Sequence, residues 1–194
     1  DFLAGEKTEW HNIVEAVDAD GKPHAVLRDA SEKPKGAHCG RTHWVYKMRL
    51  GDNVQTACGR SRLVYDPWTV GSHNSTLAEL FEGLPLYSPS SCWNGTCCLF
   101  ACKVQHKMCC LGFDVRQAYL NAKLPEDKGY WADLPAGYRE LYPGKLLYFT
   151  SAIYGAPPSG RAWYETNMTA LEKDVGLVRL KSEPTIAVRN DSRG

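Results

Sequence analysis

The sequence lacks a long hydrophobic run and an excess of charge of either sign. Its longest uninterrupted apolar run is six residues, Cys97 to Cys102, far below the roughly 20 that a membrane-spanning helix needs. Lys plus Arg number 23 and Asp plus Glu number 22, which gives a net charge of +1. This balance excludes a polycation that binds nucleic acid by bulk charge, although a local basic patch stays open. The hydrophobic fraction of 43% also excludes a disordered chain, so we expect one globular domain or two small ones.

Several enzyme motifs are missing as well. There is no G-x-S-x-G nucleophile elbow, no P-loop and no G-x-G-x-x-G phosphate loop. Because no C-x-x-C pair occurs, a structural zinc site has no evident set of ligands. His38 precedes Cys39, and Cys102 lies four residues before His106. Such proximity arises readily by chance in a chain rich in cysteine, so it gives little support for Cys–His catalysis.

Cysteine, by contrast, is plentiful and clustered, since six of the eight cysteines lie between Cys92 and Cys110. We expect five of these to be free thiols that serve as small buried apolar side chains. They are Cys97, Cys98, Cys102, Cys109 and Cys110. Disulfides or a bound metal remain alternatives. Four glycosylation acceptor patterns, at Asn74, Asn94, Asn167 and Asn190, keep a secreted Cys-rich glycoprotein as a minor alternative.

Hydrophobic periodicity and turn residues predict helices and strands without a regular βαβ rhythm, which indicates an α+β fold. Trp10, Ile13, Val14 and Val17 fall on one face of a short helix, with Thr8 as its N-cap. Further helices are expected at 97–107 and 159–175. Strands are expected at 25–27, 42–50, 54–58, 62–65, 109–115, 145–151 and 185–188, with a turn at 51–53 and a long loop at 66–96.

The stretch from Leu111 to Asn121 carries the most chemical information. A carboxylate, Asp114, ends an apolar segment, and Tyr119 follows five residues later. In a nucleotidyl transferase palm, a carboxylate in this place holds a divalent ion near the incoming triphosphate. The aromatic ring closes the floor beneath the sugar and leaves no room for a 2′-hydroxyl. The alternative is that Asp114 caps the next helix, which is a common use of Asp after a strand.

Five groups of segments together resemble, in order and spacing, the reverse transcriptase of Ty1/copia-type retrotransposons. They are Trp44-Val45-Tyr46-Lys47, Arg60 to Val64, Phe113 to Leu124, Tyr130 with Leu134 to Tyr138, and Ala152 to Gly155 with Arg161 to Tyr164. The likeness covers most of residues 41–188 and implies a partial polymerase fingers and palm, an incomplete right hand.

The resemblance also implies roles for individual residues. Asp114 would be a catalytic Mg²⁺ ligand and Tyr119 the residue that selects deoxynucleotides. Four further residues would contact nucleotide or nucleic acid, namely Lys47, Arg60, Arg62 and Gly155. For the basic residues, a solvated edge hairpin protected against aggregation is an equally open interpretation.

The sequence departs from that family at the second catalytic motif. Polymerase chemistry of this kind uses two metal ions held by carboxylates from two motifs. The second, Tyr-x-Asp-Asp, has no counterpart, because the sequence contains no Asp-Asp pair. The family's Y-G-L-K-Q-A-P segment becomes Tyr154 to Gly160, without its lysine and glutamine. We therefore expect a remnant truncated before the second motif, non-catalytic and retained as an accessory or structural subunit. A fragment of an active RNA-directed DNA polymerase is the alternative.

These expectations divide the chain into an N-terminal helix and loop extension at 1–40, a fingers-like region with a divergent Cys-rich segment at 41–110, and a truncated palm-like region at 111–194. Other protein subunits are the expected partners, because aromatic side chains are enriched at interfaces and the chain has six Trp and ten Tyr. Nucleic acid is a weaker expectation, and no transmembrane segment is expected. A non-catalytic subunit needs no cofactor, whereas an active polymerase needs Mg²⁺.

Overall fold

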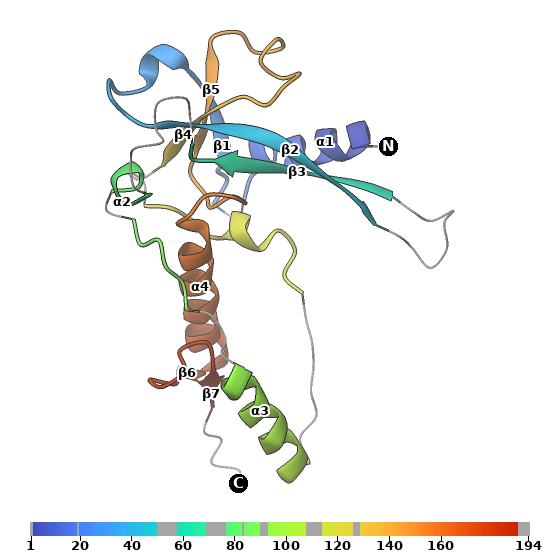
Figure 1. Ribbon diagram of the computed structural model, residues 1–194, viewed down its shortest axis with the longest axis vertical. Coiled ribbons are helices and arrows are strands. Elements are labelled where there is room, and N and C mark those ends of the chain that lie inside the picture. The colour runs from blue at the N-terminus through green and yellow to red at the C-terminus, as the bar shows by residue number, and fades with distance from the viewer. Residues whose placement is uncertain are drawn as a thin grey trace.

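The main feature of the computed structural model is a five-stranded sheet in the order β1-β5-β4-β2-β3 (Figure 1). The structure describes residues 2–18, 20–49, 58–68, 77–82, 84–89, 93–107, 114–125 and 129–189. The strands are β1 (Ala25–Asp29), β2 (Cys39–Arg49), β3 (Cys58–Asp66), β4 (Tyr130–Asp133) and β5 (Lys145–Phe149). Neighbours run antiparallel except β2 and β4, which are parallel. A second, two-stranded sheet pairs β6 (Val178–Arg179) with β7 (Ala187–Val188).

The helices flank this sheet rather than alternate with its strands. α1 (Phe2–Trp10) continues through a π-helical turn, η1 (His11–Glu15), and packs against β3. α3 (Trp93–Gln105) and α4 (Ser159–Ala170), which ends in the π-helical turn η5 (Leu171–Val175), lie below the sheet in Figure 1. Shorter elements are η2 (Ala30–Glu32), α2 (Leu77–Leu80) and η4 (Ala118–Asn121). The α+β class is confirmed, and the five-stranded sheet combines strands from all three regions distinguished in the sequence.

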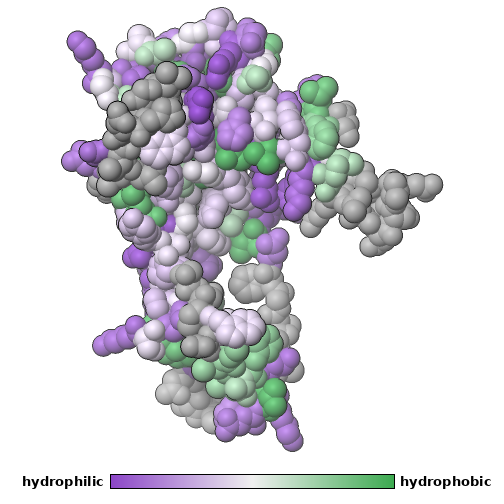
Figure 2. Space-filling model, in the orientation of Figure 1, coloured by the Kyte–Doolittle hydropathy of each residue, from purple (hydrophilic) through white to green (hydrophobic). Residues whose placement is uncertain are grey.

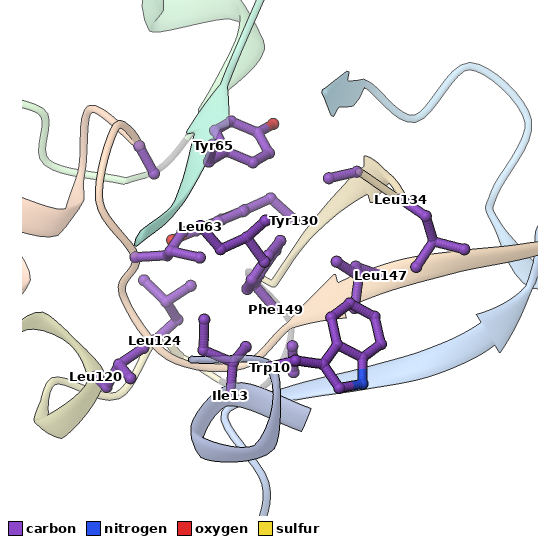
Figure 3. Packing of buried hydrophobic residues seen from close by; sticks show 14 of the residues in the cluster. Trp10, Ile13, Leu63, Tyr65, Leu120, Leu124, Tyr130, Leu134, Leu147 and Phe149 are labelled. Atoms are coloured by element: carbon purple, nitrogen blue, oxygen red, sulfur yellow. The ribbon is translucent and has the colours of Figure 1, made fainter. Parts of the chain in front are cut away.

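One hydrophobic core joins α1 and η1 to the sheet (Figure 3). Trp10 and Ile13 are buried against inward-facing side chains of β3, β4 and β5, among them Leu63, Tyr130 and Phe149. Alternate strand residues face this core, as the two-residue period of a strand requires. Burial of these large side chains fixes α1 beside β3, and that placement forms one wall of the site described below.

The predicted hairpin is confirmed, but its second strand differs from the prediction. Trp44 pairs with Leu63 and Lys47 with Arg60, so the partner strand, β3, runs without a break from Cys58 to Asp66 and includes the strand expected at 62–65. The turn at 51–53 and residues 54–57 lie outside the described residues. The hairpin extends sideways from the rest of the sheet (Figure 1).

Several predicted boundaries and caps are wrong. Thr8 is not an N-cap, because α1 already begins at Phe2 and the Thr8 hydroxyl donates to the carbonyl of Ala4 at 2.9 Å. Val17 is 60% exposed, because the helix ends at Glu15 and carries it off the buried face. The loop expected at 66–96 contains α2 and the start of α3. Of the strand expected at 109–115, only Asp114 and Val115 are described, and they are in no strand.

The predicted burial of the α3 cysteines is also wrong. Cys97, Cys98 and Cys102 are free and exposed, because α3 packs too little against the sheet to cover them. Cys109 and Cys110 lie outside the described residues.

The helix at 159–175 is confirmed, with Gly176 in the left-handed conformation expected after a helix end (φ 74°). No helix in the described part of the chain is long and apolar enough to cross a membrane.

Candidate functional site

A cavity of about 970 Å³ lies between α1, β3 and the segment that contains Asp114. The helical wall is formed by α1 with Asn12 of η1, and the strand wall by residues 59–62 of β3. Residues 114–118 and Tyr154 are the other described residues of the lining. The cavity thus brings Asp114 together with Arg60 and Arg62, which are more than 50 positions away in the sequence.

The Asp114 side chain is exposed and has no hydrogen-bond or ion-pair partner among the described residues. It does not cap the next helix, because the N-cap position of η4 is occupied by Gln117, and no side chain caps η4. Gln117 itself adopts the left-handed conformation at φ 52°. This conformation turns the chain sharply between Asp114 and Tyr119. The carboxylate of Asp114 is therefore available to a ligand in the cavity.

Tyr119 is not among the residues that line the cavity, but its ring packs against that of Tyr154, which does line it. The two ring centroids are 5.0 Å apart with an interplanar angle of 56°. On the cavity side, the guanidinium carbon of Arg62 lies 4.6 Å from the Tyr154 centroid, within the range of a cation–π contact. Tyr154 therefore connects the basic wall of the cavity to Tyr119.

The structure fixes the position of Tyr154 through its neighbours. The Tyr154 carbonyl accepts a hydrogen bond of 2.8 Å from the Tyr65 N–H of β3. Gly155 has φ 87°, and a Cβ there would collide with the Tyr65 carbonyl oxygen. Gly155 is not among the residues that line the cavity, so its observed role is to allow this close approach to β3.

Lys47 also lies outside the cavity lining. It is exposed on β2 opposite Arg60, so it extends the basic character of the hairpin beyond the cavity. Of the residues that sequence reasoning selected, Arg60, Arg62 and Asp114 line the cavity, Tyr119 contacts its wall through Tyr154, and Lys47 and Gly155 lie beside it.

The charges in the cavity are mixed but mainly positive on the strand side. Arg60, Arg62 and Arg116 line the cavity together with the two carboxylates of Glu9 and Asp114. The Nε atom of Arg62 is buried and has no hydrogen-bond partner among the described residues. A buried N–H without an acceptor costs free energy.

Two effects act in opposite directions on the pKa of the Glu9 carboxyl group. Burial raises the pKa of its carboxyl group above the ordinary value. The hydrogen bond from the backbone N–H of Leu63 and the positive charges of Arg62 and Arg60 act in the opposite direction and are the smaller effect.

The described residues do not bring three or more His, Cys, Asp or Glu side chains together around one point. Mg²⁺ commonly needs only one or two protein carboxylates, because substrate phosphates and water supply its other ligands. Asp114 therefore suits a Mg²⁺ ion that arrives with a phosphorylated ligand better than a resident, fully protein-bound metal.

Sequence reasoning missed Glu9, Arg116 and Tyr154 as residues of the site. Arg116 and Tyr154 lie inside segments that resemble the polymerase family. Arg116 follows Asp114 by two residues and Tyr154 directly precedes Gly155, so both could have been selected from the sequence. The place of Glu9 in the cavity depends on a long-range contact between α1 and β3, in which the Ser61 hydroxyl donates to the Phe2 carbonyl at 2.8 Å.

A second surface feature lies on α3. Trp93, Cys97, Phe100 and Val104 follow one another at i, i+4, i+7 and i+11, so they share one side of the helix, and all four are exposed. Trp93 is 78% and Val104 77% exposed. Figure 2 shows apolar side chains gathered over this lower part of the molecule.

Comparison with models of known protein families, with curated proteins and with solved structures finds no significant match to this chain.

Proposed function

We propose that this chain carries the nucleotide-binding part of a Ty1/copia-type reverse transcriptase, and that the cavity beside Asp114 binds a deoxynucleoside triphosphate. The observation that carries the proposal is the convergence of Asp114, Arg60 and Arg62 in one cavity, with Tyr154 and Tyr119 at its edge. The three residues come from two separate segments, Arg60 to Val64 and Phe113 to Leu124, that each resemble that family.

The basic residues would bind the phosphates. Arginine offers several N–H donors in a fixed planar arrangement, which suits phosphate oxygens. Arg62 lines the cavity, so a phosphate oxygen bound there would accept hydrogen bonds from its guanidinium group. Arg60 and Arg116 would add positive charge around the same group.

Asp114 would hold the Mg²⁺ that accompanies the triphosphate, and this ion would neutralise phosphate charge and orient the α-phosphate. Tyr119 would lie under the sugar and disfavour a ribonucleotide. Its ring is held by the contact with Tyr154, which is itself fixed to β3 by the hydrogen bond from Tyr65.

Bond formation needs more than this cavity offers. The two-metal reaction requires carboxylates from a second motif, and the 194 residues contain no Asp-Asp pair. Among the described residues of the cavity lining, Glu9 is the second carboxylate, and it forms no metal-ligand cluster with Asp114. We therefore propose that these residues bind nucleotide but do not extend a primer unless a further segment or chain supplies the missing carboxylates.

The test is binding of dTTP with Mg²⁺ to the 194-residue chain by isothermal titration calorimetry. Arg62→Gln should weaken binding about tenfold or more, because it removes a charged hydrogen-bond donor from the phosphate site. The matched control is Arg28→Gln, since Arg28 also stacks on a tyrosine (4.3 Å from the Tyr148 centroid) but lies outside the cavity. Equal losses in the two variants, or no binding by the unaltered chain, would reject the proposal.

A second candidate, an accessory subunit of a larger protein assembly, is favoured by the exposed apolar side of α3. Large apolar patches on an isolated chain are typical of contact surfaces. Sedimentation velocity of the chain should show association that increases with concentration and is reduced by Phe100→Glu. The control, Lys103→Gln, makes an equally large change of charge off that side of α3. A chain that stays monomeric at all concentrations would contradict this candidate.

A further inference from the structure

The structure places a carboxylate on the helical wall of the cavity that the arginines of β3 also line. Glu9 lies on α1 immediately before Trp10, which is 4% exposed and anchored in the core. Because Trp10 and Ile13 hold the helix, Glu9 is fixed against β3 and lines the cavity beside Arg60 and Arg62. Its position follows from packing of the helix, so it does not depend on a flexible surface loop.

The contacts of Glu9 show which charge it faces. Its carboxylate accepts a hydrogen bond from the Leu63 N–H and interacts with the positive charges of Arg62 and Arg60. These are the arginines that a triphosphate would use. A carboxylate beside them neutralises part of their charge and repels a second anion, and such effects are strong where water is partly excluded.

We propose that Glu9 limits the affinity of this cavity for polyanionic nucleotides, as a resident negative charge that shares Arg60 and Arg62 with the incoming phosphates. This inference rests on the proposed function of the cavity. Its consequence is that the penalty grows with the negative charge of the ligand. The affinity for a triphosphate should be reduced most, and the affinity for an uncharged nucleoside should not be affected.

A purely structural role of Glu9 makes a different prediction. If its carboxylate only satisfies the Leu63 N–H at the edge of the sheet, substitution can weaken ligand binding or leave it unchanged but cannot strengthen it. Glu9→Gln separates the two roles, because the amide oxygen keeps an acceptor of the same shape and removes the charge.

The test compares dissociation constants of the 194-residue chain for dTTP with Mg²⁺ and for thymidine, by isothermal titration calorimetry. Glu9→Gln should tighten dTTP binding about fivefold, the effect expected from removing one nearby like charge at a partly exposed site. Thymidine binding should not change. Glu9→Asp keeps the charge and should bind dTTP as weakly as the unaltered chain.

Glu6→Gln is the matched control. Glu6 lies on the same helix, but it accepts a hydrogen bond from the Tyr46 hydroxyl and does not line the cavity, so dTTP affinity should stay unchanged. Unchanged or weaker dTTP binding in Glu9→Gln, or an equal gain in Glu6→Gln, would overturn this inference while leaving the proposed function intact. Absence of dTTP binding by the unaltered chain would overturn both.

Discussion

The guanidinium carbon of Arg62 lies 4.6 Å from the ring centroid of Tyr154, and the ring of Tyr119 lies 5.0 Å from the same centroid. A basic residue of β3 and an aromatic residue of η4, distant in the sequence, are thus joined through one side chain. In the proposed function, the first of these residues binds phosphate and the second lies beneath the sugar. Tyr154 would therefore link the two parts of nucleotide recognition.

Replacement of Tyr154 tests that link. Tyr154→Ala should raise the dissociation constant of dTTP about fivefold, because it removes a cation–π contact worth roughly 1 kcal/mol and leaves the Tyr119 ring without its neighbour. It should also reduce the preference for dTTP over UTP. Tyr154→Phe keeps the ring and should retain both properties. An alanine variant that binds like the unaltered chain would show that the ring contact has no part in recognition.

Gly155 provides a test of the local fold. Gly155→Ala should lower the free energy of unfolding by about 3 kcal/mol or more, because a Cβ meets both a left-handed backbone and the Tyr65 carbonyl. The control is Gly137→Ala, which has nearly the same φ, 85°, with nothing within 4 Å, and should cost about 1 kcal/mol. Urea denaturation measures both, and equal losses would contradict the close approach of Gly155 to β3.

The buried His24 predicts a pH dependence of stability. Its Nδ1 lies 3.1 Å from the Ser151 hydroxyl, and burial lowers its pKa below the ordinary 6.5. Below pH 6.5 the unfolded chain takes up a proton that the folded chain resists, so the stabilising contribution is complete above that pH and declines as pH falls.

The free energy of unfolding, measured by urea denaturation from pH 7.5 to 5, should therefore fall with acidity. His24→Gln should remove about 1 kcal/mol of that fall. His38, whose pKa burial also lowers, supplies a remaining part. A variant whose pH dependence matches that of the unaltered chain would contradict the assigned role of His24.

The cysteines should differ in reactivity. Burial raises the pKa of Cys39 to about 11, and its thiol lies 3.9 Å from an Asp133 carboxylate oxygen. Cys97, Cys98 and Cys102 are exposed on α3. Iodoacetamide at pH 8 should label the α3 cysteines at least about ten times faster than Cys39, since the thiolate is the reacting form. Mass spectrometry of peptides measures this, and equally fast labelling of Cys39 would contradict it.

Local sequence patterns correctly predicted the helices and strands whose hydrophobic residues recur at a clear spacing or that end at a strong turn residue. The helix that ends before Gly176 and the strand that contains Trp44 were predictable because each pattern is decided within a few residues. The burial of α3 was mispredicted for the opposite reason. An apolar run such as Cys97 to Cys102 has the same composition whether or not another element covers it, and coverage is decided by distant parts of the chain.

In the candidate site, too, some residues could be predicted from local sequence and others depend on long-range contacts. Asp114, Arg60 and Arg62 were accessible from sequence, because each belongs to a segment with a recognisable pattern of neighbours. Glu9 was not, because its place in the cavity results from the packing of α1 on β3 across more than 50 residues of chain. Tyr154 acquires its role through a hydrogen bond from Tyr65, which no local pattern reports.

The most direct measurement of the proposed function is the effect of Mg²⁺ on dTTP binding to the unaltered chain and to Asp114→Asn. Mg²⁺ should tighten binding about tenfold in the unaltered chain, because the Asp114 carboxylate and the phosphates share the ion, and should have little effect in Asp114→Asn. The cavity and its arginines remain in that variant, so weak binding without Mg²⁺ should persist. An equal effect of Mg²⁺ in both proteins, or no effect in either, would contradict the assignment of this cavity as a polymerase-type nucleotide site.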